Sequence, residues 1–373
     1  MNFEGMKNEY EQWQKGEKDR AENKQRMNVS DYAYLVLQND MLVFLPQDDQ
    51  RNLDKIPSGF INQIFRNFRK TANSSVANKV HDKEIEYDNL LTRVKSSDKR
   101  KILSILTEKY ASDLMEEAEE RLKEKGNSFS FRIDKDNIQY LASEDGQAEK
   151  RYYKDNITHY LKAVIEEYAE LPYAERECIY YKEMVDEIDM SVKDKKVLKI
   201  FLKKGRNESK KSSIKYMKVL GCYRDKEYLY NYVAGLMSDD RKGTWSPGAI
   251  RLTSMASCER LEQPAFISKE NVEVIIALMK KQGVQYISAG SNDYKVVVKF
   301  TSRGEKMYQR VLHLRPLYIN KREDKVYEFH CSKFQAESYF FKFGPEVRIL
   351  EPVSLAEEFR NRYMAAANQY LPK

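Results

Sequence analysis

The residues of this chain that could do chemistry are cationic and aromatic side chains gathered in residues 193–224. This segment holds twelve Lys and Arg residues and two acids, Asp194 and Glu208. Apolar residues such as Phe201 and Tyr216 interrupt the lysines, which indicates strands that display the charge. A basic surface on a folded body is typical of proteins that bind a polyanion. A solvated loop or a disordered arm is the alternative.

Tyrosine is the second notable residue type. The chain has 26 tyrosines, and Tyr228, Tyr230 and Tyr232 share one parity on a predicted strand, so they could line one face of it. Cations that follow phosphates, together with rings that stack on bases, are what a single-stranded nucleic acid requires. For any single tyrosine, packing in the protein core is an equally good interpretation.

Catalytic residues do not form a recognisable motif. Cys178, Cys222, Cys258 and Cys331 are scattered, as are the four histidines, so we predict no metal site and no cofactor. The sequence contains no Walker loop, glycine-rich dinucleotide loop or His-Glu-x-x-His helix. The acidic run 116–120 is most simply a solvated helix face. We therefore expect a protein that is not an enzyme, with a metal-dependent nuclease as the weak alternative.

The N-terminal half predicts strands that are each followed by helices. Residues 1–27 form a polar tail, and residues 28–182 a helical region. Segment 31–37 alternates weakly and predicts a strand, and segment 128–133 alternates strictly. Strand, short helix and long helix are the ribbon-helix-helix order, in which two paired strands contact the major groove of DNA. An ordinary α+β lobe is the alternative. The possible ribbon contacts are Tyr32, Tyr34, Ser128, Ser130 and Arg132.

The rest of the chain predicts a small β domain and an α/β extension. Short strands at 197–202, 214–220, 228–236 and 249–252 predict a small SH3-like β-barrel within residues 183–262. Residues 263–373 alternate between helices and strands and end with a helix from Ser354 to Tyr370. The expected fold class is therefore α+β.

The middle segment resembles a WYL domain. The strand Tyr228–Ala234 carries Asn231-Tyr232-Val233 where that family has Trp-Tyr-Leu, and it lies between a basic strand and a closing strand. In the closing strand Arg251 matches the first of two arginines usual in the family, whereas Ser254 replaces the second. The helix 158–171 and the segment Tyr339–Gly344 resemble the WYL accessory proteins of type VI-D CRISPR loci.

This resemblance implies a homodimer, formed through the C-terminal extension, that binds single-stranded RNA. It also implies that the protein stimulates the RNA-guided, RNA-targeting effector of its locus in antiviral defence. Arg251 would contact phosphate, and a structural salt bridge is its alternative role. The predicted nucleic-acid-binding residues are Lys199, Lys203, Lys204, Arg206, Lys215, Lys218, Arg224, Tyr228, Tyr230, Tyr232 and Arg251.

Two other functions stay open from the sequence. A DNA-binding transcriptional regulator of WYL type would use the ribbon and sense a ligand through the barrel. A scaffold would bind a protein partner through the basic block, and its binding would depend only weakly on salt. The sequence has no apolar run long enough for a membrane span and no signal-peptide core, which predicts a cytoplasmic protein without a membrane partner.

Overall fold

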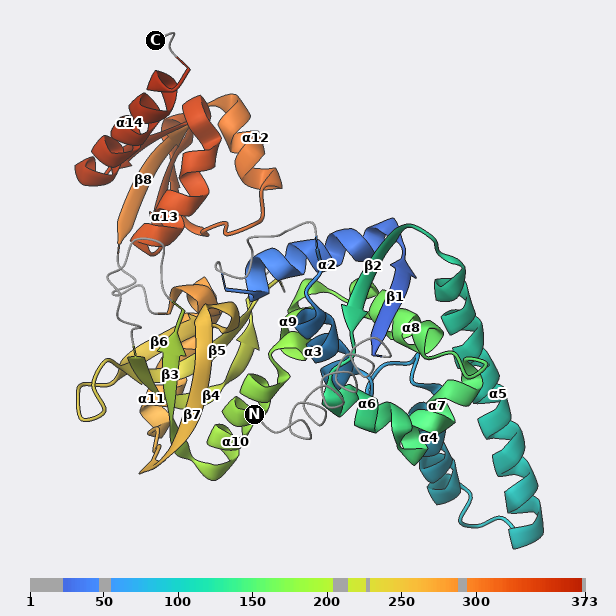
Figure 1. The fold of residues 1–373 in the computed structure, drawn as a ribbon. Coiled ribbons are helices and arrows are strands. Elements are labelled where there is room, and N and C mark those ends of the chain that lie inside the picture. Colours follow the sequence, from blue (N-terminus) through green and yellow to red (C-terminus); the bar gives the residue numbers. More distant parts are fainter. Residues whose placement is uncertain (1–22, 47–54, 204–213, 226–228, 288–293, 371–373) are drawn as a thin grey trace, which may run out of the picture. The chain divides into compact units, whose positions relative to one another are not determined.

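The computed structural model describes residues 23–46, 55–203, 214–225, 229–287 and 294–370. The chain divides into two compact units, residues 1–182 and 183–373. Both units combine helices with antiparallel strands (Figure 1), which confirms the predicted α+β class.

Unit 1 is a two-stranded ribbon on a bundle of helices. Strands β1 and β2 pair antiparallel, with Lys24 opposite Arg132 and Val29 opposite Asn127. The centre of the bundle is α8, in which residues 160–169 are all buried. The elements are β1 (Lys24–Val29), α2 (Asp31–Phe44), α3 (Ser58–Phe68), α4 (Val76–Leu90), α5 (Ser96–Lys123), β2 (Asn127–Arg132), α6 (Lys135–Ala142), α7 (Glu144–Tyr152), α8 (Ile157–Glu170) and α9 (Tyr173–Tyr180).

The first strand of the ribbon lies earlier than we predicted. Segment 31–37 belongs to helix α2, and Ser30 caps this helix by accepting the backbone N–H of Ala33 at 3.0 Å. The strand is Lys24–Val29, which begins in the predicted polar tail 1–27 and ends two residues beyond it. The buried residues of α2 recur at helical spacing, which the weak alternation of its first turns concealed: Ala33, Val36, Leu37, Asp40, Met41 and Phe44.

Unit 2 contains two antiparallel sheets. The first has the strand order β6-β5-β4-β3-β7 and the second the order β11-β8-β10-β9. The strands are β3 (Lys196–Leu202), β4 (Ile214–Arg224), β5 (Asn231–Ser238), β6 (Ser246–Arg251), β7 (Met255–Pro264), β8 (Lys295–Phe300), β9 (Tyr318–Arg322), β10 (Val326–His330) and β11 (Val347–Glu351). The helices are α10 (Lys182–Asp194), α11 (Lys269–Gln282), α12 (Ser302–Arg310), α13 (Lys333–Phe340) and α14 (Val353–Asn368), with short 3-10 turns that include η3 (Val284–Tyr286).

The five-stranded sheet is open rather than a closed barrel. Among the described residues, β6 and β7 are its two edges, and no ladder joins them. Strand β7 was not predicted and continues through residue 262, where we placed a domain boundary. It is a polar strand whose residues are mostly exposed, so it lacks the alternation by which strands are recognised.

The two faces of this sheet carry different helices. On one face Cys258 of β7 donates to the carbonyl of Met184 in α10 at 3.9 Å, and Arg260 pairs with Glu187 at 3.0 Å. The other face packs Ala234 and Leu236 of β5 against α11 and η3. The second sheet is buried by an aromatic core that holds Phe300, Phe329, Tyr339, Phe340 and Phe343.

Candidate nucleic-acid interface

Three of the predicted cations share one face of the five-stranded sheet. Cross-strand partners lie on the same face, and side chains alternate along a strand. Lys199 lies opposite Tyr216, which lies opposite Ser238 of β5. Leu236 is two residues before Ser238 on β5 and lies opposite Lys218 of β4. Tyr232 is six residues before Ser238 and lies opposite Arg251 of β6. Lys199, Lys218 and Arg251 therefore belong to one surface, which we name the cation–aromatic face.

Each of these cations lies over an aromatic ring. The distances from the charged group to the ring centroid are 4.6 Å for Lys199 over Phe201, 4.8 Å for Lys218 over Trp245 and 3.6 Å for Arg251 over Tyr230. The three rings are half-buried, so each keeps part of its surface accessible, and Trp245 also packs against the cluster formed with α11 and η3. Half-exposed rings beside cations can accept a stacked base while the cation meets the adjacent phosphate.

Part of the predicted tyrosine row serves the protein core. Tyr232 and Tyr223 face each other on β5 and β4 and pack against the cluster formed with α11 and η3. Burial raises the pKa of the Tyr223 hydroxyl above its usual value, so the ring stays neutral. Tyr230 differs from them because its ring lies under the Arg251 guanidinium rather than in that cluster.

Lys215 lies on the opposite face. It is opposite Ile200 of β3 and shares its parity with the buried Met217, and its ammonium pairs with Asp239. Lys199 also has a carboxylate partner, Glu259 of β7, at 2.7 Å. Exposed pairs of this kind contribute little to stability, so a phosphate could replace the carboxylate at low cost.

The remaining predicted residues of unit 2 lie at strand ends. Lys203 follows β3, and its backbone N–H donates to the carbonyl of Ser254 at 2.9 Å. Arg224 is the exposed last residue of β4. Lys204, Arg206 and Tyr228 lie outside the described residues.

Sequence analysis missed Trp245 and Phe201 as site residues. Trp245 precedes β6 in a loop, so no strand pattern marks it, although it is one of only two tryptophans in the chain. Phe201 alternates with Lys199 on β3, and this spacing of two was a usable signal.

The ribbon of unit 1 presents a second polar face. Because β1 lies earlier in the chain than predicted, the ribbon contains residues that we did not expect there. Tyr32 and Tyr34 do not belong to the ribbon, since they lie on α2. The register sets Lys24 opposite Arg132, Arg26 opposite Ser130 and Asn28 opposite Ser128. The outer face therefore consists of Lys24, Arg26, Asn28, Ser128, Ser130 and Arg132.

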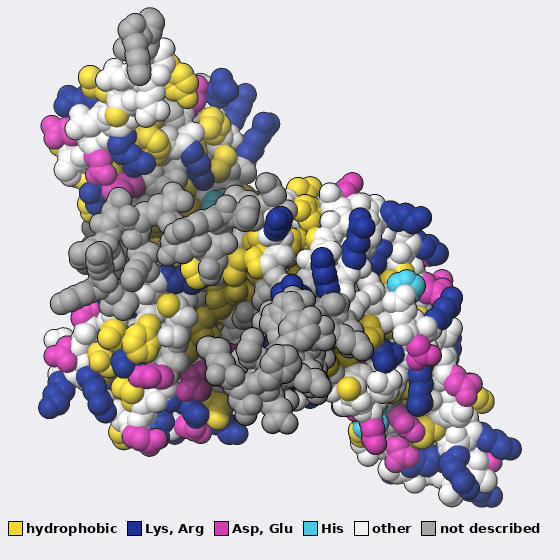
Figure 2. All heavy atoms as spheres, in the orientation of Figure 1, with side chains coloured by type: hydrophobic (Ala, Val, Ile, Leu, Met, Phe, Trp, Pro, Cys, Tyr) yellow, Lys and Arg dark blue, Asp and Glu magenta, His cyan; other side chains and the backbone are white. Residues whose placement is uncertain are grey.

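The ribbon face is basic and its cations are not neutralised. Within the described part of the chain, none of Lys24, Arg26 and Arg132 forms an ion pair, and all three are exposed. Figure 2 shows Lys and Arg side chains over the region where Figure 1 draws β1 and β2. Asn28 is held in the ribbon, because its Nδ2 donates to the carbonyl of Gly126 at 3.0 Å. A basic two-stranded ribbon has the width and charge that a duplex major groove admits.

The inner face of the ribbon is fixed to α8. Met27, Val29, Phe131 and Ile133 are buried, as the alternation of 128–133 predicted for its own strand. Just after β1, the Glu166 carboxylate accepts the N–H of Ser30 at 2.6 Å and its hydroxyl at 2.7 Å. These contacts hold the start of α2, and with it the ribbon, against the central helix.

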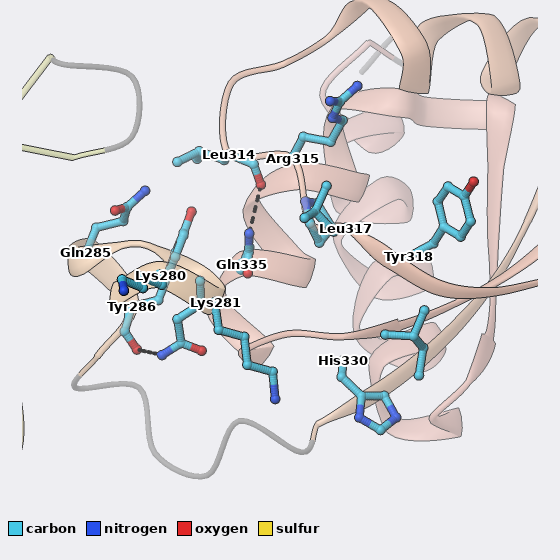
Figure 3. Close-up of a pocket in the computed structure, with 13 residues that line it drawn as sticks. Lys280, Lys281, Gln285, Tyr286, Leu314, Arg315, Leu317, Tyr318, His330 and Gln335 are labelled. Carbon is cyan, nitrogen blue, oxygen red and sulfur yellow. Dashed lines mark hydrogen bonds between the residues drawn. The ribbon is translucent and has the colours of Figure 1, made fainter. Parts of the chain in front are cut away.

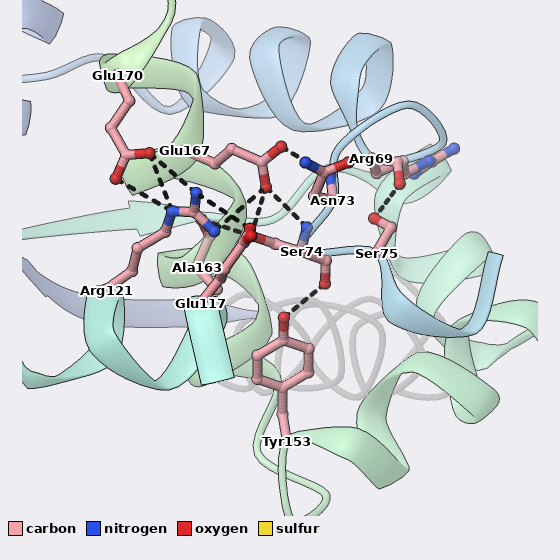
Figure 4. A network of polar contacts seen from close by, with 10 residues as sticks. All are labelled: Arg69, Asn73, Ser74, Ser75, Glu117, Arg121, Tyr153, Ala163, Glu167 and Glu170. Carbon is pink, nitrogen blue, oxygen red and sulfur yellow. Dashed lines mark hydrogen bonds and ion pairs between the residues drawn. The ribbon is translucent and has the colours of Figure 1, made fainter. Parts of the chain in front are cut away.

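The carboxylates of unit 1 converge on an arginine in a supporting network (Figure 4). Arg121 of α5 contacts Glu170 at 2.9 Å, Glu167 at 3.8 Å and Glu117 at 4.0 Å. Glu167 also accepts two bonds from Ser74, at 2.7 Å from its N–H and 2.6 Å from its hydroxyl. The network therefore fastens the turn before α4 to α5 and α8. In the described segments we find no group of three or more His, Cys, Asp or Glu residues that could hold a metal ion.

Comparisons with known proteins bear on the fold. The chain matches no protein-family model and no curated protein. A solved structure described as the crystal structure of a CRISPR Cas-related protein matches with a TM-score of 0.70 at 21% identity, over 93% of this chain and 94% of that chain. The two chains share a fold. Proteasome accessory factor B/C of Arthrobacter aurescens has a TM-score of 0.29 at 16% identity, over 66% of this chain and 37% of that chain, which carries no argument.

The comparison therefore shows a fold shared with a CRISPR Cas-related protein, whereas membership of the WYL family and a role at a CRISPR locus stay predictions. No helix among the described residues is both long enough and apolar enough to cross a bilayer.

Proposed function

We propose that this chain is a CRISPR-associated accessory protein that binds single-stranded RNA on its cation–aromatic face. In this proposal it stimulates an RNA-guided, RNA-targeting effector, acts as a homodimer, and has no catalytic activity of its own. Its open five-stranded sheet then corresponds to the WYL domain that the sequence resembles.

The observation that carries this proposal is the set of three cation–ring pairs on one face of one sheet. Lys199, Lys218 and Arg251 can each meet a phosphate, and the ring beside each cation offers a surface for a base. Duplex bases are already stacked on one another and cannot use such rings, so this pairing favours a single strand. The shared fold with a CRISPR Cas-related protein supports the biological setting.

A direct titration tests the proposal. Full-length protein is titrated against labelled single-stranded RNA, single-stranded DNA and duplex DNA of equal length, at low and near-physiological salt. We expect preference for single-stranded RNA and binding that weakens with salt. Preference for duplex DNA would contradict it. Adding the protein to a purified RNA-guided RNA-targeting effector then tests stimulation, and cleavage rates that do not change would exclude that role.

The alternative is a DNA-binding regulator that uses the ribbon. The outer face of β1 and β2, with Lys24, Arg26 and Arg132 exposed and without ion pairs in the described chain, favours it specifically. The variant Arg26→Gln/Arg132→Gln separates the two functions, because it removes ribbon charge and leaves the sheet intact. Loss of duplex binding without loss of single-stranded RNA binding would establish two independent surfaces.

A further inference from the structure

A cationic pocket of unit 2 shares no lining residue with Lys199, Lys218, Arg251 or their rings, although α11 and η3, which help to form it, pack on the same face of the sheet. It has a volume of about 370 Å³ and is formed by the end of α11, by η3, by the segment that leads into β9, and by side chains of β10 and α13 (Figure 3). This volume lies at the lower end of the range of small-molecule sites, roughly 300 to 1,000 Å³. The pocket is therefore large enough for one nucleotide and too small for a folded partner.

The charge of the pocket favours an anion. Lys280, Lys281 and Arg315 line it beside the imidazole of His330, and none of its described lining residues is a carboxylate. The Glu328 carboxylate lies 3.9 Å from the Nε2 of His330. The same carboxylate is paired with Arg322 at 2.8 Å. Lys280 and Lys281 are in the last turn of α11, where cations offset only about half a charge of the helix dipole. The positive charge of Lys280 and Arg315 exceeds this half charge of the helix end.

The positions of the cations define two ends. Figure 3 shows the side chains of Lys281 and His330 extending toward one end of the pocket, whereas Arg315 extends at the other. Arg315 is engaged with its own subdomain, because its guanidinium lies 5.5 Å from the ring of Tyr308. The end with Lys281 and His330 is thus the better position for a phosphate.

Two buried amides form a fixed polar wall. Gln282 and Gln335 are each 5% exposed. Gln282 Nε2 donates to the carbonyl of Tyr286 at 2.9 Å, and Gln335 Nε2 donates to the carbonyl of Leu314 at 3.2 Å. These bonds set the orientation of both amides and leave the second N–H and the Oε1 of each for a ligand. Donor and acceptor side by side match the polar edge of a nucleobase.

The rim of the pocket is unusually apolar for an exposed surface. Leu317, Tyr318 and Ile319 are 65%, 48% and 57% exposed. The buried Tyr286 ring, 6.1 Å from Phe334, closes the inner side. A flat ring lying on Leu317 would cover apolar surface that is otherwise in water.

We propose that this pocket binds a nucleotide, with the phosphate between Lys281 and His330 and the base against Leu317 and the two glutamine amides. The ligand is a free mononucleotide or the terminal nucleotide of an RNA strand, since both present the same phosphate and base. The lining of this site contains none of the cations or rings of the cation–aromatic face, so the proposal does not depend on the function proposed for that face.

Calorimetric titration of the full-length protein tests the site. The probes are AMP, UMP, adenosine and inorganic phosphate. We expect a nucleotide to bind at least about tenfold more tightly than adenosine or phosphate, because each of these lacks one half of the recognised group. No binding of any nucleotide at millimolar concentration, or equal binding of phosphate alone, would overturn the proposal.

Variants connect binding to the pocket. The double substitution Lys281→Gln/His330→Gln should weaken nucleotide binding by about tenfold or more, since the charge-assisted contact of Lys281 and the imidazole contact of His330 are lost. Lys269→Gln, in the first turn of the same helix and outside the pocket, is the matched control and should bind normally. Equal affinities for both variants would place the nucleotide elsewhere. Thermal unfolding of each variant checks that the fold is retained.

A competition experiment identifies the source of the nucleotide. Labelled AMP is bound to a variant with a disabled cation–aromatic face, Trp245→Leu/Arg251→Gln, and 5′-phosphorylated or unphosphorylated tetranucleotides are added. Displacement by the phosphorylated strand alone supports a terminal nucleotide, and displacement by neither strand supports a free one. If AMP does not bind this variant, the pocket is not an independent site and the proposal fails, whatever the fate of single-stranded RNA binding.

Discussion

The cations of the unit 2 sheet and those of the unit 1 ribbon are held in different ways. On the cation–aromatic face Lys199, Lys218 and Arg251 each lie within 4.8 Å of a ring centroid, and Lys199 also has a carboxylate partner. On the ribbon Lys24, Arg26 and Arg132 are exposed and have no ring and no carboxylate partner among the described residues. A ring beside a cation favours an unpaired base, whereas a row of bare cations favours the regular phosphates of a duplex. The chain thus carries two surfaces with different expected selectivity.

The largest effect is expected on the sheet. Trp245→Leu/Arg251→Gln removes one stacking surface and one cation that lies on a second ring, and we expect single-stranded RNA binding to weaken by about 100-fold. Fluorescence anisotropy at fixed salt measures the change. Duplex binding by the ribbon should be unaffected, which would sharpen the contrast between the two surfaces.

Lys215→Gln is the control for this experiment. Lys215 is also a lysine of the five-stranded sheet, but it lies on the opposite face and is paired with Asp239. We expect a change of less than about twofold. A loss comparable to that of the double variant would show that RNA follows the wrong face, and the proposed site would have to be moved.

The next effect concerns the ribbon. Lys24→Gln/Arg26→Gln/Arg132→Gln should reduce duplex binding by about tenfold at low salt. It should also lower the slope of log affinity against log salt by about 3, since each phosphate contact contributes about 0.9. Titrations at four salt concentrations measure both quantities. An unchanged slope would mean that these cations do not meet phosphate and would remove the ribbon from consideration.

The attachment of the ribbon to α8 gives a third way to separate the surfaces. Glu166 is 5% exposed and accepts both polar groups of Ser30. Glu166→Ala leaves a buried N–H and hydroxyl without their acceptor, and we expect unit 1 to lose about 2 kcal/mol of stability. Hydrogen exchange at the Ser30 amide reports the loss locally. Faster exchange together with unchanged RNA binding is the expected result; a parallel loss of RNA binding would show that the two units are coupled.

The smallest effect is a pH dependence confined to unit 1. Burial raises the pKa of Glu149 to about 7, although the N–H groups of Ala77 and Asn78 both donate to it at 2.9 Å. A carboxyl group whose pKa is higher in the folded than in the unfolded state contributes its full stability to the fold at pH values below its unfolded pKa. This contribution is lost as the pH rises through 7. We expect unit 1 to lose about 1 kcal/mol between pH 5 and 8.

Hydrogen exchange of the α4 amides at pH 5 and pH 8, corrected for intrinsic rates, measures this loss. Glu149→Gln should make the difference disappear. Unit 2 is an internal control, because burial raises the pKa of Cys258 and Cys331 to about 12 and both thiols stay protonated in the folded state over this range. A pH dependence that persists in Glu149→Gln would assign it to another group.

Local pattern was sufficient for much of the fold. The alternation of 128–133 identified β2 and its buried face, and the helix expected over 158–171 is α8. It failed at β1 and β7, which are short or polar strands stabilised by partners far away in the chain. It also failed at α2, whose first turns mimic a strand.

The candidate site was less predictable than the fold. The basic block located the correct strands, and the spacing of three residues already puts Lys215 and Lys218 on opposite faces of β4, but it could not show which face carries the aromatic rings. The pairing of Lys199 with Glu259 joins residues from strands that are not neighbours in sequence. Trp245 became a candidate only when a tertiary contact placed its ring under Lys218.

The ribbon of unit 1 has a consequence for symmetry. Both of its strands come from one chain, and their outer residues differ: β1 offers Lys24, Arg26 and Asn28, whereas β2 offers Ser128, Ser130 and Arg132. Dimeric readers of DNA bind two equivalent half-sites because their own halves are identical. A ribbon with unlike strands has no such dyad. The duplex segment under one ribbon would be read in one direction only, as a non-palindromic half-site with a defined polarity, and the proposed homodimer would repeat this half-site through its own dyad.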